Sequence, residues 1–507
     1  MKNHYIRILF IKMKKALLIY FFTIICGVCM AKPKIISSEP CEYREVLCNR
    51  EHYYNFIKNE ITFNQALEDI DMFIYLLENA YSGYDDLKSN NFKIQTLREN
   101  IPFTKGNNVK TDEILSFLYE QLKPYINDFH FYMIGKNKQL GFRYPIRVFF
   151  SNIFLLKNNE QFKVIKTDNP NIKIGDIYND STYYLFLYPS EGKDIYRLGV
   201  FLQKEDEKDN NLIELLFNDK KIYVSCSETN SQLKKISETS YKEIITNESV
   251  YFYLPTLIEP DIHWDNFDVY EEMYKKFTTL GLRYGEKKNY ILDFRGNGGG
   301  NDLYCQKFLA NLLFGKNEKD EIRNYKKFEN HISFSSVNLY SPPILQAIKW
   351  YGNNRKKEYD NYFKKIYKFM KKNNFNKIKT ENSKRGVTKK INFSSKLIVI
   401  MDKNSCSSGE SFVYLANPLL EEEKNLFYIG ENSGGCFNYG NVFCYQLPNS
   451  GMAIYLPSMK MKSGIIEECK GYMPNYWAFH EDLLLAIENI TGDKQLSEKL
   501  KDINNNL

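Results

Sequence analysis

Apolar side chains in the first quarter of the chain recur at helical spacing. A capping-box sequence begins at Thr62, and the apolar positions that follow it fall on one face of a helix: Leu67, Ile70, Ile74, Leu77 and Tyr81. A second helix is predicted to start at Thr111 and to end before Pro124, with Ile114, Leu115, Leu118 and Leu122 facing inward. The pattern therefore predicts a helical region over residues 60–125.

Further along the chain, the spacing of apolar residues changes twice. Residues 140–256 contain short β-type runs, such as 146–150, separated by turn clusters such as 169–171. From about residue 285, apolar strands alternate with helices. The expected strands are 290–294, 397–401, 427–429 and 452–456, and the expected helices are 303–313, 410–415 and 483–490. This alternation implies an α/β core with a largely parallel sheet.

The N-terminus has the layout of a secretory signal. Lys14 and Lys15 precede a short apolar run over 16–25, and small residues end at Ala31. The run is too short for a comfortable membrane-spanning helix, and no later segment is long and apolar enough to span a bilayer. We expect residues 1–31 to direct export to a periplasmic or extracellular location. An uncleaved membrane tether is the alternative.

Composition and charge limit the kinds of molecule that the protein is expected to bind. The chain has 507 residues, 43% hydrophobic and 26% charged, which favours a folded protein over a disordered one. Its formal charge is +7, but five Lys and Arg lie in the first 31 residues, where there is no acid, and without them the charge is +2. Such a balance argues against a nucleic-acid partner. The basic, aromatic stretch 355–390 is interpreted as a solvated helical insertion.

Eight cysteines would remain after signal cleavage: Cys41, Cys48, Cys226, Cys305, Cys406, Cys436, Cys444 and Cys469. An exported chain can oxidise them. Cys41 with Cys48, and Cys436 with Cys444, are close enough in sequence to bridge short loops, although sequence does not specify the pairing. There is no CxxC pair and no His/Cys cluster at zinc spacing. We therefore predict no metal and no other cofactor.

Three separated segments carry candidate chemistry. Residues 293–300 place a glycine run directly after a strand, where backbone N–H groups can face a reacting centre. Residues 404–410 place serines at a strand-to-helix turn, and residues 126–130 end in His130. Taken singly, the serine turn is more often a helix cap and the histidine more often structural. The glycine loop could bind phosphate, but it lacks both the GxGxxG spacing and a final Lys-Ser/Thr.

Together they resemble the tail-specific (C-terminal-processing) serine peptidase family. The resemblance rests on Asp-x-Arg-x-Asn-x-Gly-Gly from Asp293, Ser-x-x-Glu from Ser407, the Gly-Glu-Asn-Ser-Gly-Gly run at 430–435, and Asp-x-His at 128–130. A late Glu-x-x-Gly-x-x-Pro element matches 468–474, with Asn475 in place of the family's Asp. The family implies a Clp-protease/crotonase-like α/β core and a protein or peptide substrate.

One branch of the family uses a Ser–Lys dyad, but residues 430–437 contain no lysine. The sequence is similar to the other branch, which includes the tricorn protease and shares its fold with the interphotoreceptor retinoid-binding protein. That resemblance implies Ser407 as nucleophile, His130 as general base and Glu468 as the group that orients the imidazole. Glu467 competes for the last role.

The same resemblance places the oxyanion between the N–H of Ser408 and one from Gly298 or Gly299. Asp293 and Arg295 are expected to fix the glycine loop rather than to react. Cys406, beside the nucleophile, is a less favoured alternative to it.

The expected domains are a helical N-terminal domain (32–135), a small β domain at the position of the family's PDZ module (136–248), and the core (249–495) with a basic insertion (316–395). We expect an exported serine endopeptidase. The alternative from another class is a non-catalytic protein of the same fold that binds a peptide or a lipid. The oligomeric state is not predictable from the sequence.

Overall fold

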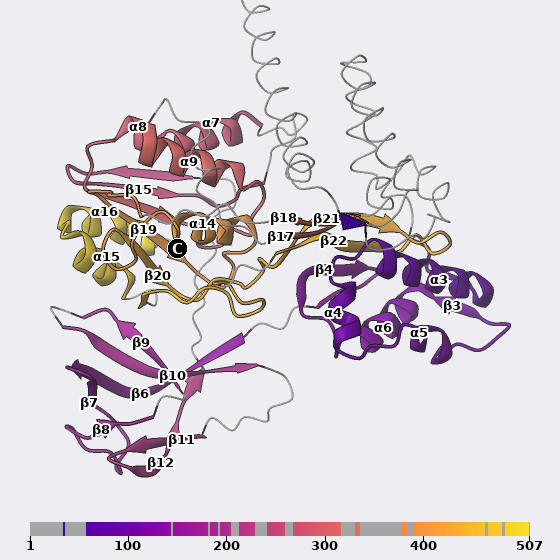
Figure 1. Ribbon diagram of the computed structural model, residues 1–507, viewed down its shortest axis with the longest axis horizontal. Coiled ribbons are helices and arrows are strands. Elements are labelled where there is room, and N and C mark those ends of the chain that lie inside the picture. The colour runs from indigo at the N-terminus through magenta and orange to yellow at the C-terminus, as the bar shows by residue number, and fades with distance from the viewer. Residues whose placement is uncertain are drawn as a thin grey trace, which may run out of the picture. The chain divides into compact units, whose positions relative to one another are not determined.

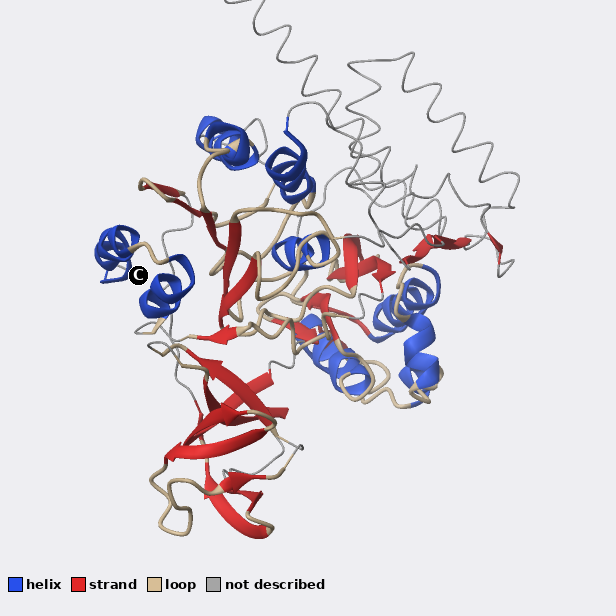
Figure 2. Ribbon diagram, turned by 60° about the vertical axis from the view of Figure 1, so that its left-hand side comes forward, coloured by secondary structure: helices blue, strands red, loops and turns tan. Residues whose placement is uncertain are grey.

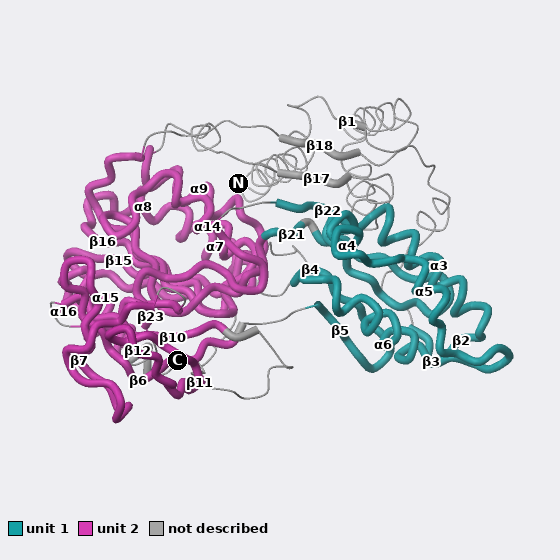
Figure 3. Tube along the Cα trace, turned by 60° about the horizontal axis from the view of Figure 1, so that its bottom comes forward, with its two compact units in different colours: residues 1–143, 328–384, 438–463 teal, residues 144–327, 385–437, 464–507 magenta. Residues whose placement is uncertain are grey.

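The computed structural model describes most of the chain from residue 57 onward. The described residues are 34–35, 57–142, 146–180, 183–190, 193–203, 212–228, 241–258, 267–315, 330–334, 378–382, 390–461, 465–478 and 482–505. The chain forms two compact units, each built from several segments (Figure 3). Unit 1 comprises residues 1–143, 328–384 and 438–463, and unit 2 comprises 144–327, 385–437 and 464–507.

Unit 1 contains the predicted helices. They are α3 (Phe63–Asn79), α4 (Tyr84–Ser89), α5 (Thr96–Glu99) and α6 (Thr111–Leu122). The capping box at Thr62 is confirmed, because its hydroxyl accepts from the Gln65 N–H and the Gln65 side chain accepts from the Thr62 N–H. A short ladder of β2 (Glu60–Thr62) with β3 (Asn108–Lys110) joins the starts of α3 and α6.

The helices of unit 1 pack on an antiparallel sheet. Its strands are β1 (Lys34–Ile35), β4 (Asp128–Ile134), β5 (Gln139–Phe142), β17 (Asn330–Phe334), β18 (Ile378–Asn382), β21 (Tyr439–Gln446) and β22 (Ala453–Met461). Apolar residues of α3 and α6 share one core with residues of the late hairpin, including Phe443, Met452 and Ile454. The strand predicted at 452–456 exists, but it pairs in this antiparallel sheet and not in the parallel core.

Unit 2 contains the predicted parallel sheet. Its strands are β14 (Lys242–Ile245), β15 (Ser249–Tyr253), β16 (Asn289–Asp293), β19 (Lys396–Met401), β20 (Leu426–Gly430) and β23 (Tyr476–Trp477). β15, β16, β19, β20 and β23 run parallel in that spatial order, and β14 is antiparallel at the edge. Every residue of β16 and β20 is buried, as expected for parallel strands covered on both faces.

Helices cover both faces of this sheet (Figures 1 and 2). They are α7 (Phe267–Thr278), α8 (Leu280–Arg283), α9 (Leu303–Phe314), α14 (Ser408–Ala416), α15 (Leu483–Thr491) and α16 (Lys494–Asn505). On one face, Phe308 of α9 packs on Phe277 of α7 and Phe412 of α14. On the other, α15 and α16 contribute to a core with Ile291 and Ile398 of the sheet. The predicted α/β core is thereby confirmed.

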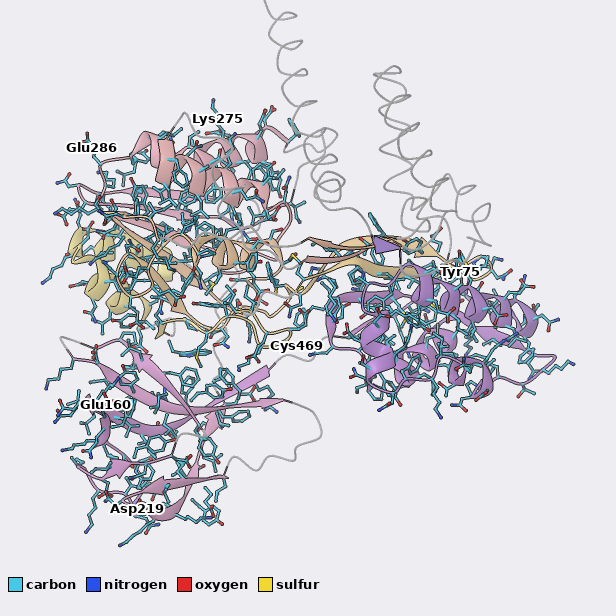
Figure 4. The ribbon with its side chains drawn as sticks, viewed as in Figure 1. Tyr75, Glu160, Asp219, Lys275, Glu286 and Cys469 are labelled. Atoms are coloured by element: carbon cyan, nitrogen blue, oxygen red, sulfur yellow. The ribbon has the colours of Figure 1, made fainter. Side chains whose placement is uncertain are left out.

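The remaining strands of unit 2 are antiparallel. They are β6 (Ile146–Asn158), β7 (Gln161–Lys166), β8 (Ile177–Tyr178), β9 (Tyr184–Tyr188), β10 (Ile195–Gln203), β11 (Leu212–Phe217), β12 (Lys220–Ser225) and β13 (Ser227–Glu228). Figure 4 labels Glu160 and Asp219, which lie at the β6–β7 and β11–β12 turns. Leu155, Leu198 and Leu215 belong to a separate apolar core. This confirms the predicted β character of the segment.

Several expectations lie outside the described residues: the signal at 1–31, the Cys41 and Cys48 thiols, and most of the basic stretch 355–390. Cys436 and Cys444 are described, and both are free thiols. Within the described residues, no helix combines the length and apolar character that crossing a bilayer requires.

Candidate active site

Three loops of unit 2 leave the same edge of the parallel sheet. β16, β19 and β20 are neighbouring parallel strands that end at Asp293, Met401 and Gly430. The glycine run follows β16, the serine turn follows β19, and the 431–437 segment follows β20. The carboxyl edge of a parallel sheet is where α/β proteins place ligands. Segments 293–300 and 404–410, two of the three that the sequence analysis singled out, are thus side by side.

Ser407 has an unusual backbone conformation. Its φ is 53° and its ψ is −117°, and it directly precedes α14. A residue with a Cβ rarely adopts positive φ, and such a conformation costs of order 1–3 kcal/mol. Ser407 occupies the N-cap position, yet its side chain makes no capping bond to the helix. The strain is therefore not explained by capping, and it is typical of a sharp strand-to-helix turn that presents a nucleophile.

The glycine loop lies against this turn. The Cys406 N–H donates to the Asn297 carbonyl at 2.9 Å, and the Ser408 hydroxyl donates to the Gly300 carbonyl at 2.6 Å. Gly299, with φ of 101°, approaches so closely that a Cβ there would lie 2.7 Å from the Cβ of Ser407. The absence of a side chain at 299 is what permits this contact.

Two backbone donors at this contact have no acceptor in the part of the protein that the structure describes. Among the described residues, no acceptor meets the N–H of Gly298 or that of Ser408, the first residue of α14. The Gly299 N–H, by contrast, donates to Oδ1 of Asn297 at 3.0 Å. Of the two glycines considered from the sequence, Gly298 therefore has the available donor.

Asp293 and Arg295 fix the start of the glycine loop. Their side chains form a buried ion pair at 2.6 Å, and the Tyr251 hydroxyl donates to the same carboxylate at 2.7 Å. Asp402 also ties the two loops together, because its Oδ1 accepts the N–H groups of Gly296 and Asn404, each at 3.0 Å. Asp293 and Arg295 thus lie paired at the base of the glycine loop, and their role in positioning it stays a prediction.

Glu410 holds the third loop, a role that the sequence analysis did not assign. Its buried carboxylate, in the first turn of α14, accepts from the Ser433 hydroxyl and from the N–H groups of Gly435 and Cys436, the latter at 2.8 and 2.7 Å. Burial raises its pKa to about 7, against the lowering effect of these donors. The Cys436 carbonyl in turn accepts the Ser407 N–H at 3.0 Å. The Ser-x-x-Glu spacing is the signal for this residue.

The structure separates the two competing glutamates. Oε2 of Glu468 accepts the Phe437 N–H at 3.3 Å, and Glu468 is half-buried. Glu467 is exposed and pairs with Lys470 at 3.1 Å. Figure 4 labels Cys469, which follows Glu468 and whose N–H donates to the Gly435 carbonyl at 2.7 Å. Glu468 is therefore the carboxylate attached to the third loop.

The Cys406 thiol faces the third loop. Its Sγ points to the side of Gly434, where a Cβ would lie 2.1 Å from the sulfur. The Cys436 thiol is hydrogen-bonded to Cys406, and burial raises the pKa of Cys436. The described residues hold no group of three or more His, Cys, Asp or Glu side chains placed for a metal ion.

His130 belongs to unit 1, on β4. It is half-buried, and desolvation lowers its pKa to about 4. The main-chain N–H of His130 donates to Oδ1 of Asp128 at 2.8 Å. The imidazole is thus uncharged at pH 7, and it is a weaker base than an ordinary histidine.

A family comparison identifies the part of the chain that holds these loops. Residues 261–468 match the model of Peptidase family S41. The matched segment belongs to this family. The resemblance to the tail-specific serine peptidases is thereby confirmed, and the chain is a serine-type peptidase.

Solved structures give more distant likenesses. The chain is 13% identical to mature CPAF in complex with lactacystin, with 88% of this chain and 99% of that chain covered and a TM-score of 0.39. A putative peptidase from Parabacteroides merdae is 14% identical, with 85% and 94% covered and a TM-score of 0.36. The photosystem II D1 C-terminal processing protease is 11% identical, with 86% and 98% covered and a TM-score of 0.35. A search of the curated proteins found no match.

Proposed function

We propose that this S41 peptidase is an exported serine endopeptidase of the Ser-His-Glu branch. His130 removes the hydroxyl proton of Ser407 as Oγ attacks the peptide carbonyl, and it gives this proton to the leaving amine as the C–N bond breaks and the acyl-enzyme forms. Water then hydrolyses the acyl-enzyme, with His130 again as the base, and Ser407 is regenerated. Glu468 orients the imidazole. The N–H groups of Ser408 and Gly298 stabilise the oxyanion.

The conformation of Ser407 is the observation that carries this proposal. Ser407 is strained and does not cap its helix, and it lies beside two backbone N–H groups that have no acceptor among the described residues. This is the arrangement that acyl transfer needs. A fold kept only for binding a peptide or a lipid has no need of this strain. Desolvation lowers the pKa of His130 to about 4, so the imidazole is a weak base until the charge of Glu468 stabilises its protonated form.

The decisive experiment is active-site labelling. A fluorophosphonate probe should modify the wild-type protein on Ser407, and neither Ser407→Ala nor His130→Ala should be labelled or hydrolyse fluorescein-casein. Both variants should keep the wild-type melting temperature to within a few degrees. Labelling that persists in Ser407→Ala, or wild-type protein that is folded yet neither labelled nor active, would contradict the proposal and favour the binding protein.

Export is tested separately. The mature protein secreted from a host should begin after Ala31, as read by mass spectrometry of its N-terminal peptide. Retention of residues 1–31 in a membrane fraction would instead indicate the tether.

A further inference from the structure

The strand that carries His130 is interrupted at that residue. β4 pairs with β5 through Asp128 and Phe142, and the next pair is Tyr132 with Gly141. Four steps along β4 therefore correspond to one step along β5, so that residues 129–131 form a bulge. Bulges redirect side chains and are frequent beside active sites.

The Asp128 carboxyl closes this bulge. It is fully buried, and its Oδ1 accepts the His130 N–H at 2.8 Å. The Phe131 N–H and the Tyr81 hydroxyl also face the carboxyl. Oδ1 of Asp128 thus binds the main chain at the centre of the bulge, whereas its buried Oδ2 has no hydrogen-bonding partner among the described residues.

Aromatic packing holds the carboxyl in place. Tyr81 is only 2% exposed, and its ring lies 5.1 Å from that of Phe131. Phe131 in turn lies 4.7 Å from Phe142 of β5, which pairs with Asp128 across the ladder. The bulge is therefore fixed on one side by rings and on the other by a carboxyl.

We propose that Asp128 is a positioning residue for catalysis, which sets the place of the His130 imidazole by fixing the main chain of the β4 bulge. This inference rests on the proposed function, because it takes His130 as the general base. All of the contacts that carry it lie within unit 1.

The charge of Asp128 changes in the range where the enzyme would work. Burial raises its pKa to about 7, the donors from His130, Tyr81 and Phe131 lower it, and Asp86 raises it. Among the described residues, the titratable and charged groups around this carboxyl, directly or one contact away, include His130, Tyr81, Asp86, Tyr439 and Lys460. Ionised Asp128 makes stronger bonds to main-chain N–H groups than the neutral acid does. We therefore expect the bulge to tighten as pH rises through about 7.

Asp128→Asn tests this role, because asparagine keeps an acceptor for the His130 N–H but cannot ionise. The readout is inactivation by the fluorophosphonate probe, measured to saturation from pH 5 to 9. We expect the limiting rate constant to fall about 10- to 100-fold at pH 8, with little change in the half-saturating probe concentration. The wild-type rise near pH 7 should disappear. Tyr81→Phe should lower the rate constant less.

Asp69→Asn is the matched control. Asp69 is equally buried in unit 1, and its carboxylate accepts the N–H groups of Asn449 and Ser450, each at 2.8 Å. This variant should lower the melting temperature at least as much as Asp128→Asn, while the rate constant and its pH dependence stay as in the wild type.

The outcomes separate this inference from the proposed function. If Ser407→Ala and His130→Ala abolish labelling, but Asp128→Asn has the same rate constant and pH profile as Asp69→Asn, only the role of Asp128 is wrong. If Asp128→Asn does not fold, a wild-type profile without a rise near pH 7, together with unchanged kinetics in Tyr81→Phe, would overturn the inference.

Discussion

At the scale of single residues, two adjacent glycines differ in what a side chain would meet. A Cβ on Gly299 would lie 2.7 Å from the Cβ of Ser407 and 2.9 Å from the Ser408 nitrogen, at a φ of 101° that side-chain-bearing residues rarely adopt. A Cβ on Gly298 would meet nothing within 4 Å. Of these two positions, only 299 must be glycine for the glycine loop to lie against the serine turn.

Gly299→Ala should accordingly lower the rate of fluorophosphonate labelling by at least 100-fold, because displacing an oxyanion donor costs about 3 kcal/mol in the transition state. Gly298→Ala keeps its main-chain N–H, and it should retain a tenth or more of the wild-type rate. Labelling rates and melting temperatures of the two variants, measured side by side, check this. Equal rates in both variants would show that the close approach at 299 has no catalytic consequence.

The neighbouring glutamates offer a second comparison at this scale. Glu468→Gln should reduce the labelling rate at least 10-fold, because the amide no longer carries the charge that stabilises the imidazolium. Glu467→Gln removes only an exposed pair with Lys470, which is worth less than about 1 kcal/mol, and the rate should not change. A loss of activity confined to Glu467→Gln would reverse the assignment.

The places of the glycine run and the serine turn could be predicted from the sequence, because each segment follows an apolar strand. The role of Ser407 came from the family resemblance and stays a prediction. Glu410 received no role because its three donors come from residues 23 to 26 positions later, and only the fold shows that proximity. The choice of Gly298 over Gly299 likewise needed the bond from Gly299 to Asn297.

At the scale of elements, β20 leads directly into a second buried carboxyl. Glu431 follows this strand and is 4% exposed, and its Oε1 has no hydrogen-bonding partner among the described residues. Burial, assisted by the charge of Asp402, raises its pKa from the ordinary 4.5 to about 7. Between about pH 4.5 and 7, Glu431 is therefore protonated in the folded state and ionised in the unfolded chain.

This difference makes unit 2 less stable as pH rises. The contribution of protonated Glu431 to the free energy of unfolding is fully present below about pH 4.5 and is lost as pH rises through about 7. The loss amounts to about 3 kcal/mol, at 1.36 kcal/mol per pKa unit. Glu431→Gln should weaken this pH dependence at little cost at pH 5. Hydrogen exchange of peptides spanning 426–437 at pH 5 and 8, corrected for intrinsic rates, measures the effect. An unchanged pH dependence in the variant would exclude Glu431 as its source.

At the scale of the whole molecule, periodicity predicted which segments form strands but not which sheet they join. The run at 452–456 has the apolar character of a core strand, yet it pairs with β4 of unit 1, more than 300 residues earlier. The parallel strands were predictable as a group because helices separate them along the chain. Which sheet β22 joins depends instead on its cross-strand partners, and the local apolar pattern does not specify those partners.

The discontinuity of unit 1 has a consequence for its folding. Apolar residues of the late hairpin belong to the same core as those of α3 and α6, and the buried carboxylate of Asp69 binds the turn of this hairpin at 449–450. Residues 57–142 alone would leave that core open and Asp69 without these donors, at a cost of several kcal/mol. We expect this fragment to be unfolded, and a chain in which a short Gly/Ser linker joins it to 438–461 to regain helical circular dichroism and a cooperative melt. Asp69→Ala in the linked chain should abolish or markedly lower that transition. A cooperative melt of 57–142 by itself would show that the early helices form their core without the hairpin.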